Sequence, residues 1–228
     1  MIEVLVFDLD DTLFPEHEFV LSGFQSVSNW LETKYCLSGF FDVAWQFFSE
    51  GKRHNVFNLT LEELRFEYER DLIQELLRIY RQHQPIISLH EDAKWAINYF
   101  NNLYQMGIIT DGYLLTQQNK VKALGIEPSF NAIVYSDLYG RDSWKPSPVP
   151  YNQIMQLLSC KGKECVYVAD NPQKDFITAN KLGWMTVQIC REGGEYAKII
   201  PKKSHEANFK IKTLVELKGI LSIEIKQY

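Results

Sequence analysis

The sequence lacks the long apolar segments of membrane proteins and the leader of a secreted protein. No stretch approaches the roughly 20 consecutive apolar residues that a membrane-spanning helix needs. The apolar run near the N-terminus is too short for the core of a signal peptide, and acidic residues interrupt it. We therefore expect a soluble, cytoplasmic protein with no membrane partner.

The chain is also poor in cysteine and has no excess of basic residues. Its four cysteines form no Cys-x-x-Cys pair, and no two histidines have the spacing of a metal site. Disulfides are possible but nothing favours them, so we expect buried free thiols. Net charge is −5, from 24 Lys and Arg against 29 Asp and Glu, without a basic stripe. This pattern predicts no nucleic-acid partner.

What the chain does contain is enough apolar material for one or two packed domains. It has 228 residues, of which 46% are hydrophobic. Short apolar runs, each typical of a strand buried on both faces, recur at residues 2–7, 107–110, 132–135, 165–169 and 185–189. Helical patterns lie between them, and one apolar face runs from Ala93 to Tyr104 before Gly107. This alternation predicts a doubly wound α/β domain with a parallel sheet.

The alternation breaks between residues 15 and 85, where we find no buried strand. Helical patterns cover residues 19–31 and 40–48, and Leu61 to Ile79 form one long helical stripe. The sequence thus predicts an all-helical domain, residues 15–85, inserted into an α/β core of residues 1–14 and 86–228. Near the C-terminus, residues 209–211 and 213–221 predict one more strand and one more helix.

Two acidic motifs follow predicted strands. Asp8 and Asp10 come after the first strand and point the same way, and Asp170 and Asp175 come after the fourth. Ligands of open α/β sheets bind at the carboxyl ends of the strands, so all four carboxylates meet at one edge. Such a cluster needs a hard cation, and all-oxygen ligation favours Mg²⁺. Taken alone, either pair could instead be an acidic loop or a helix cap.

Two further positions suit an anion at the same edge. Thr110 ends a predicted strand and, with the amides of the turn at Asp111, can hold phosphoryl oxygens. Lys145 follows another strand and can neutralise phosphate charge. Taken alone, each of these residues is better explained by the simpler alternative, a plain Asp-Gly turn for Thr110 and a surface Lys-Pro loop for Lys145.

Together, the order of acid pair, threonine, lysine and acid pair resembles that of the haloacid dehalogenase superfamily. The matching segments are DLDDT at 8–12, Thr110, Lys145 and DNPQKD at 170–175. The resemblance covers nearly the whole chain, and the helical insert resembles that family's cap. It implies a Mg²⁺-dependent phosphatase acting on a small phosphorylated metabolite, with a sugar phosphate as a guess by analogy.

The resemblance also implies individual roles. Asp8 is the nucleophile that takes the phosphoryl group, and Asp10 is the general acid and base. Thr110, Lys145 and backbone amides near Leu9, Asp10 and Asp111 hold the phosphoryl group. The metal ligands are Asp8, the main-chain carbonyl of Asp10, and Asp170, with Asp175 acting through water and orienting Lys145.

Several alternatives stay open. A phosphomutase would keep all of these residues, whereas Asp10 and Asp170 argue against a dehalogenase. A phosphoacceptor signalling domain is disfavoured by the motif order, and the intact acid set disfavours a non-catalytic binding protein. The segment 50–55 gathers basic residues, and Arg53 either grips the leaving group or belongs to a solvated connection between helices. Monomer and dimer are both compatible with the sequence.

Overall fold

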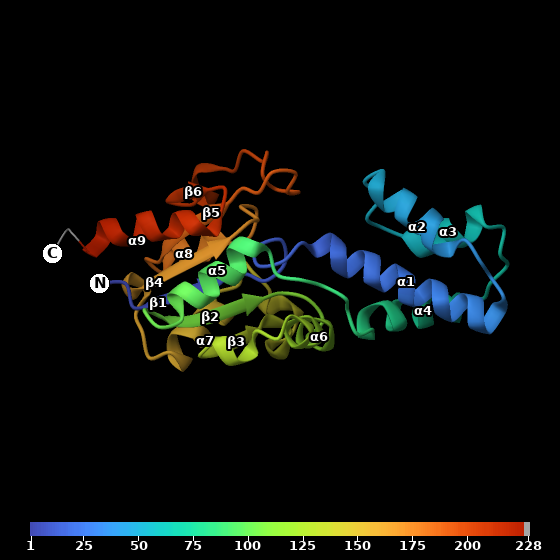
Figure 1. Ribbon diagram of the computed structural model, residues 1–228, viewed down its shortest axis with the longest axis horizontal. Coiled ribbons are helices and arrows are strands. Elements are labelled where there is room, and N and C mark those ends of the chain that lie inside the picture. Colours follow the sequence, from blue (N-terminus) through green and yellow to red (C-terminus); the bar gives the residue numbers. More distant parts are fainter. Residues whose placement is uncertain (226–228) are drawn as a thin grey trace.

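The fold is built on one six-stranded parallel sheet with helices on both faces (Figure 1). The computed structural model describes residues 1–225. The strand order is β3-β2-β1-β4-β5-β6. The strands are β1 (Val4–Phe7), β2 (Gln105–Thr110), β3 (Ala132–Tyr135), β4 (Cys165–Ala169), β5 (Met185–Ile189) and β6 (Phe209–Ile211). The helices are α1 (Glu16–Tyr35), α2 (Phe40–Ser49), α3 (Val56–Glu63), α4 (Arg70–Gln82), α5 (Glu91–Phe100), α6 (Leu114–Leu124), α7 (Val149–Leu157), α8 (Phe176–Lys181) and α9 (Leu217–Ile225).

The central strands are apolar because both faces of the sheet are covered. Helices α5, α6 and α9 pack on one face, where Leu5 and Ile108 belong to the buried cluster. Helices α7 and α8 pack on the other face, against Val6 and Tyr167. The predicted doubly wound α/β fold, including the strand and helix near the C-terminus, is confirmed.

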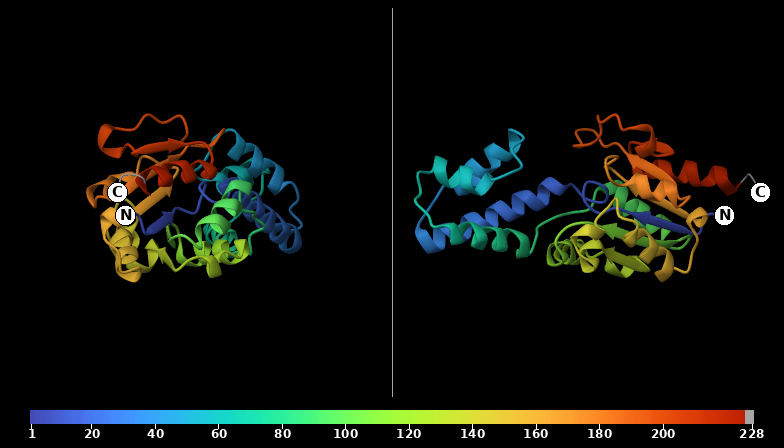
Figure 2. Two further views of the ribbon diagram at one scale, coloured as in Figure 1. Left: turned by 60° about the vertical axis from the view of Figure 1, so that its left-hand side comes forward. Right: turned by 180° about the vertical axis from the view of Figure 1, so that it is seen from behind.

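Helices α1 to α4 form a second lobe at one end of the sheet (Figures 1 and 2). They bury a separate apolar cluster, which includes Phe24, Leu31, Phe40, Leu61 and Leu76. The lobe is wholly helical, and both of its connections to the sheet lead to the same end of the core lobe (Figure 1). We call it the cap lobe and the remainder the core lobe, and we propose residues 15–85 as its extent.

The single helical stripe predicted from Leu61 to Ile79 is wrong. Helix α3 ends at Glu63, Arg65 adopts a left-handed φ of 52°, and α4 begins only at Arg70. The apolar spacing continues across this turn because both helices bury residues in the same cluster. No glycine or proline marks the break, so the pattern by itself looked continuous.

Gly107 lies inside β2 and does not end the preceding helix, which stops at Phe100. A Cβ at this glycine would lie 3.0 Å from Ile154 Cδ1, so the missing side chain lets α7 approach the sheet closely. All four cysteines are free, but only Cys165 is buried, against the expectation that the thiols are buried: Cys36 is exposed, and Cys160 and Cys190 are partly exposed. Within residues 1–225, no helix combines the length and apolar character needed to cross a membrane.

Candidate active site

The two acidic motifs meet because their strands are neighbours. Strand β1 lies between β2 and β4, with Phe7 in register with Ile108 and with Val168. Asp8, Thr110 and Asp170 therefore emerge side by side at the carboxyl edge of the sheet, as expected for ligand-binding residues of open α/β sheets. This edge faces the cap lobe, whereas the N-terminus and helix α9 lie at the opposite end (Figure 1).

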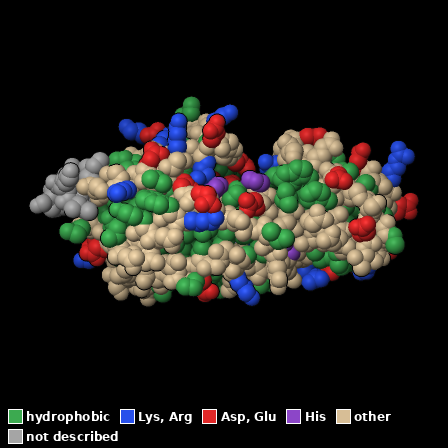
Figure 3. All heavy atoms as spheres, viewed as in Figure 1, with side chains coloured by type: hydrophobic (Ala, Val, Ile, Leu, Met, Phe, Trp, Pro, Cys, Tyr) green, Lys and Arg blue, Asp and Glu red, His purple; other side chains and the backbone are tan. Residues whose placement is uncertain are grey.

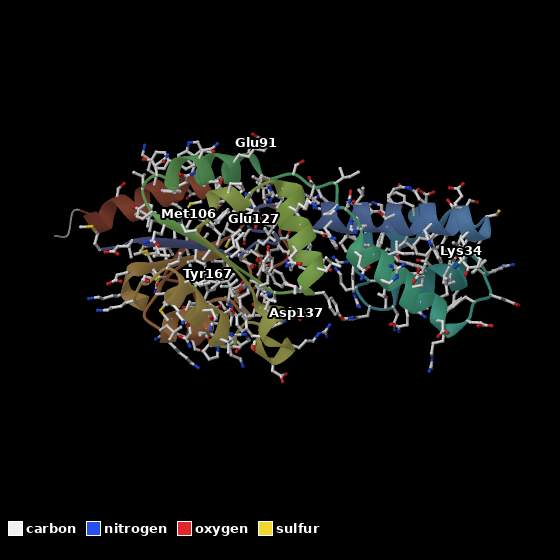
Figure 4. The ribbon with its side chains drawn as sticks, turned by 90° about the horizontal axis from the view of Figure 1, so that it is seen from below. Lys34, Glu91, Met106, Glu127, Asp137 and Tyr167 are labelled. Carbon is white, nitrogen blue, oxygen red and sulfur yellow. The ribbon has the colours of Figure 1, made fainter. Side chains whose placement is uncertain are left out.

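Lys145 is the buried centre of the site. Its Nζ lies 2.7 Å from Asp8 Oδ1 and 2.8 Å from Asp175 Oδ1, and it donates to the hydroxyl of Tyr167 at 2.9 Å. Neither Lys145 nor Asp175 has a solvent-exposed side chain. Tyr167 comes from the middle of β4, within the core lobe (Figure 4). The structure thus brings Lys145 into direct contact with both acidic motifs.

Burial and charge shift the protonation of these groups. Burial raises the pKa of Asp8 to about 6, although Lys145 opposes the rise. Burial alone would lower the pKa of Lys145, but Asp175 and Asp8 raise it well above its usual range. Burial, together with the nearby charges of Asp175 and Asp8, raises the pKa of Asp170 well above its usual range. The site therefore holds more negative charge than Lys145 can compensate.

Three of the expected acids form a cluster that could hold a cation. Asp8, Asp170 and Asp175 each offer one carboxylate oxygen, and these oxygens lie within 4.8 Å of one another. The set is all-oxygen and buried, and it carries the surplus negative charge described above. These properties fit a hard divalent cation such as Mg²⁺.

The side chain of Asp10 does not join this cluster, which corrects the expected set of four clustered carboxylates. Its Oδ1 lies 2.5 Å from Lys120 Nζ, and its Oδ2 accepts a hydrogen bond from Gln117 Nε2 at 2.9 Å. The same Gln117 nitrogen lies 2.5 Å from Thr110 Oγ1. Lys120 thus attracts the carboxylate away from the other acids, and Gln117 links the first acid motif to the threonine.

Sequence reasoning missed Gln117 and Lys120, both buried on α6. They are three residues apart on one helix face, directly after the threonine turn, and a polar pair on an otherwise packed helix could have revealed them. A third missed residue is Glu16, which begins α1 and lines the same cavity as Asp8 and Asp10. Burial, together with the charge of Asp10, raises the pKa of Glu16 to about 7.

Asp111 is hydrogen-bonded to the loop that carries Lys145. Its Oδ1 accepts a hydrogen bond from the backbone N–H of Lys145 at 3.1 Å, and its Oδ2 lies 3.1 Å from Lys174 Nζ. The carboxylate of Asp111 is therefore engaged by protein groups. The side chain of Leu9 is fully buried. The side chains at these two positions are therefore taken up by the protein, and the anion-binding role of the backbone amides there stays a prediction.

Two cavities meet at this edge. One of about 340 Å³ is lined by Asp8, Asp10, Thr116 and Lys174, among others. A larger one of about 970 Å³ extends between the cap and core lobes, and Arg53 lies in its wall. Arg53 donates through Nη1 to the carbonyl of Phe48 at 2.7 Å, and its Nε lies 3.9 Å from Glu195 of the core lobe. The structure therefore puts Arg53 beside the cavity but already engaged by protein groups.

The comparison with known families agrees with this geometry. A family model described as haloacid dehalogenase-like hydrolase matches residues 5–189. The chain belongs to this family. The hydrolase is 27% identical to a glyceraldehyde 3-phosphate phosphatase of Methanocaldococcus jannaschii, covering 97% of each chain. It is also 24% identical to the pyrophosphatase PpaX of Bacillus thuringiensis, again over 97% of each chain.

Solved structures of the family share the fold of this hydrolase. The HAD-hydrolase YfnB of Bacillus subtilis, bound to magnesium, superposes with a TM-score of 0.67 at 20% identity, covering 96% of this chain and 98% of that one. The 2-haloacid dehalogenase of Pseudomonas syringae pv. tomato also gives a TM-score of 0.67, at 19% identity, covering 98% and 99%. A magnesium-bound hydrolase and a dehalogenase thus share this architecture, and the choice of reaction depends on the site.

Proposed function

We propose that this hydrolase is a Mg²⁺-dependent phosphatase that hydrolyses a small phosphomonoester through an intermediate on Asp8. The observation that carries the proposal is the buried contact of Lys145 with Asp8 and Asp175, next to the carboxylate of Asp170, which has no salt-bridge partner among residues 1–225. A phosphate dianion is repelled by an aspartate nucleophile unless positive charge surrounds both of them. Lys145 supplies positive charge directly, and the acid cluster could supply more by holding a cation.

Asp8 is the nucleophile of the proposed reaction. It stands at the end of β1, 4% exposed, where its free oxygen can attack phosphorus in line with the leaving group. Lys145 binds its other oxygen and directs the attacking one. Attack breaks the bond between phosphorus and the leaving oxygen, and a water molecule then hydrolyses the aspartyl-phosphate.

Asp10 is the proposed acid and base. It would protonate the leaving alkoxide and later take a proton from the attacking water. Lys120 and Gln117 hold its two oxygens, so they fix the carboxylate next to the path of the proton. We assign both as positioning residues, since they act through Asp10. Gln117 also orients the Thr110 hydroxyl, which would donate to a phosphoryl oxygen together with nearby backbone amides.

Asp8 and Asp170 would hold Mg²⁺ through their carboxylates and Asp10 through its main-chain carbonyl, while Asp175 would support them. When bound, the ion neutralises charge on the phosphoryl oxygens. Asp175 is occupied by Lys145 and by the backbone N–H of Asn171 at 3.1 Å, which suits an indirect contact with the ion.

The relatives guide the choice of substrate class. Those named glyceraldehyde 3-phosphate phosphatase and pyrophosphatase act on small phosphorylated molecules. A small phosphorylated metabolite is therefore the proposed partner. A phosphomutase on the same residues is the second candidate, and measured release of inorganic phosphate separates the two. A dehalogenase is disfavoured by Asp10 and Asp170, because attack on carbon needs neither the acid nor the metal ligand.

The test is hydrolysis of 4-nitrophenyl phosphate by the purified protein. We expect turnover with Mg²⁺, loss of turnover in EDTA, and recovery when Mg²⁺ is returned. Asp8→Asn should abolish turnover while the protein folds normally, and beryllium fluoride should bind to Asp8 in the presence of Mg²⁺. Full activity without metal, or a tenth of the wild-type rate in Asp8→Asn, would contradict the proposal.

A further inference from the structure

The larger cavity between the two lobes is continuous with the catalytic edge. It has a volume of about 970 Å³. This larger cavity shares five lining residues with the smaller one at Asp8, namely Asp11, Glu16, Tyr80, Asp170 and Tyr196. A phosphoryl group bound at Asp8 would therefore have the rest of its substrate in or beside this larger space.

The two walls of this cavity differ in chemistry. The core wall is mainly polar and includes Asp11, His90, Asp170 and Arg191. The cap wall has more apolar than polar members, and the apolar ones are Pro15, Val20, Phe24, Phe48, Val56, Phe57, Ile73, Leu77 and Tyr80. Its polar members are Glu16, His17, Arg53, Asn55, Asn58 and Gln74. Figure 3 shows hydrophobic side chains gathered on the cap lobe beside the hollow, with histidine and acidic side chains opposite. The largest apolar surface available to a ligand in this space therefore lies on the cap side.

The apolar wall includes a connected group of aromatic rings. The ring of Phe24 lies 6.1 Å from Phe48, 6.0 Å from Phe57 and 5.8 Å from Tyr80, measured between centroids. Two of these contacts are edge-to-face, which is the geometry aromatic rings prefer. Phe48 and Tyr80 are only half-buried, so the group has room for a further ring from the cavity.

Two of the polar groups of the cap wall are already engaged within the cap lobe. Arg53 donates to the Phe48 carbonyl, and Asn58 donates to the hydroxyl of Tyr68 at 3.0 Å. A leaving group rich in hydroxyls would lose hydrogen bonds to water wherever it lay against the apolar side chains of this wall. A triose would also leave most of the space empty, because cavities of roughly 300–1,000 Å³ accommodate far larger ligands.

From these observations we propose that the preferred substrate is a phosphomonoester whose leaving group carries an aromatic or heteroaromatic ring, which packs against the cap wall. This inference rests on the phosphatase function proposed above. It assigns Leu77, Phe48 and Ile73 as specificity-determining residues. They contact the ring and do not take part in the transfer of the phosphoryl group.

Two matched substrates test the inference without changing the chemistry of the leaving oxygen. Ethyl phosphate and 2-phenylethyl phosphate both release a primary alkoxide and differ only in the ring. Burial of one phenyl ring should raise kcat/KM by about ten- to a hundred-fold. Glucose 6-phosphate, a polyol ester with a primary leaving oxygen, should be hydrolysed more slowly than 2-phenylethyl phosphate. A ratio below about twofold for the first pair, or a preference for glucose 6-phosphate, overturns the inference.

A pair of leucine variants tests the wall itself. Leu77 is half-buried and lines the cavity, so Leu77→Gln should lower the preference for 2-phenylethyl over ethyl phosphate several-fold. Leu21 lies on cap helix α1 but outside the cavity wall and is 41% exposed, so Leu21→Gln should leave the preference unchanged. If Leu77→Gln keeps the wild-type preference while melting normally, the assigned wall is wrong. Hydrolysis of none of the three esters would instead contradict the phosphatase function.

Discussion

Replacing Lys145 by methionine should destabilise the protein and abolish its activity together. Methionine has a similar length but no charge, and Lys145 is 0% exposed in its side chain. The change removes the ammonium that lies 2.7 Å from Asp8 and 2.8 Å from Asp175. Among residues 1–225, the two buried carboxylates would then have no salt-bridge partner, and only the more distant charge of Lys174 would act on them.

The expected loss follows from these contacts. At an effective dielectric constant of ~20, each contact of this length contributes about 6 kcal/mol of Coulomb attraction. Most of this gain offsets the cost of taking the three charges out of water. Removing one partner of such a buried group destabilises by about 3–5 kcal/mol, because the remaining charges are left uncompensated. We expect a loss of this size in the free energy of unfolding at pH 8 in EDTA.

The loss should depend on pH in a defined direction. The pKa of Asp8 already lies near 6, above its ordinary value of 3.8, and without Lys145 it should rise further. A carboxylate with a raised pKa in the folded state destabilises the protein as pH rises above the unfolded-state value. The deficit of Lys145→Met should therefore be larger at pH 8 than at pH 5. The nucleophile would also be largely protonated at neutral pH, so turnover should fall by about a thousand-fold or more.

Denaturant unfolding at the two pH values, with a turnover assay, measures both effects. Lys145→Met combined with Asp175→Asn should recover part of the stability and none of the activity. Lys94→Met removes a lysine from an exposed pair with Glu91 and should change stability by no more than about 0.5 kcal/mol. A deficit in Lys145→Met that is absent at pH 8, or larger at pH 5, would refute the electrostatic account.

Three further predictions concern the metal, the acid and the cap. Because burial and neighbouring acids raise the pKa of Asp170, Mg²⁺ binding should release protons and strengthen from pH 6 to pH 8. Calorimetry in buffers of different ionisation enthalpy measures this release, and binding that does not vary with pH would contradict it. Asp10→Asn should slow hydrolysis of ethyl phosphate far more than that of 4-nitrophenyl phosphate, because the leaving group of the aryl ester needs no proton. Equal losses for the two esters would show that Asp10 is not the general acid. Arg53→Ala should raise KM for 2-phenylethyl phosphate by less than about threefold, because Phe48 and Glu195 already engage its guanidinium. A tenfold increase would establish Arg53 as a ligand of the leaving group, which is one of the two roles that the sequence left open.

Chain order and local pattern were enough to predict the architecture. Apolar runs without polar interruption predicted strands covered on both faces, and the helical segment after the first strand predicted the cap lobe. The same patterns failed where local spacing carried no sign of a break, as between α3 and α4. There the left-handed turn at Arg65 leaves the apolar stripe unbroken, because both helices bury residues in the same cluster. The spacing of apolar residues therefore does not distinguish two short helices from one long helix.

The sequence by itself determined which chemical groups stand at the ends of the strands, because the ends of β1, β2 and β4 can be read from apolar periodicity. It thereby predicted the places of Asp8, Thr110 and Asp170. Only the tertiary structure decided their partners. Lys145 meets Asp8 across 137 residues, and Lys120 meets Asp10 across 110. Such pairings depend on how loops and helices pack at the sheet edge. The local sequence pattern does not specify which distant charged residue a buried side chain will contact.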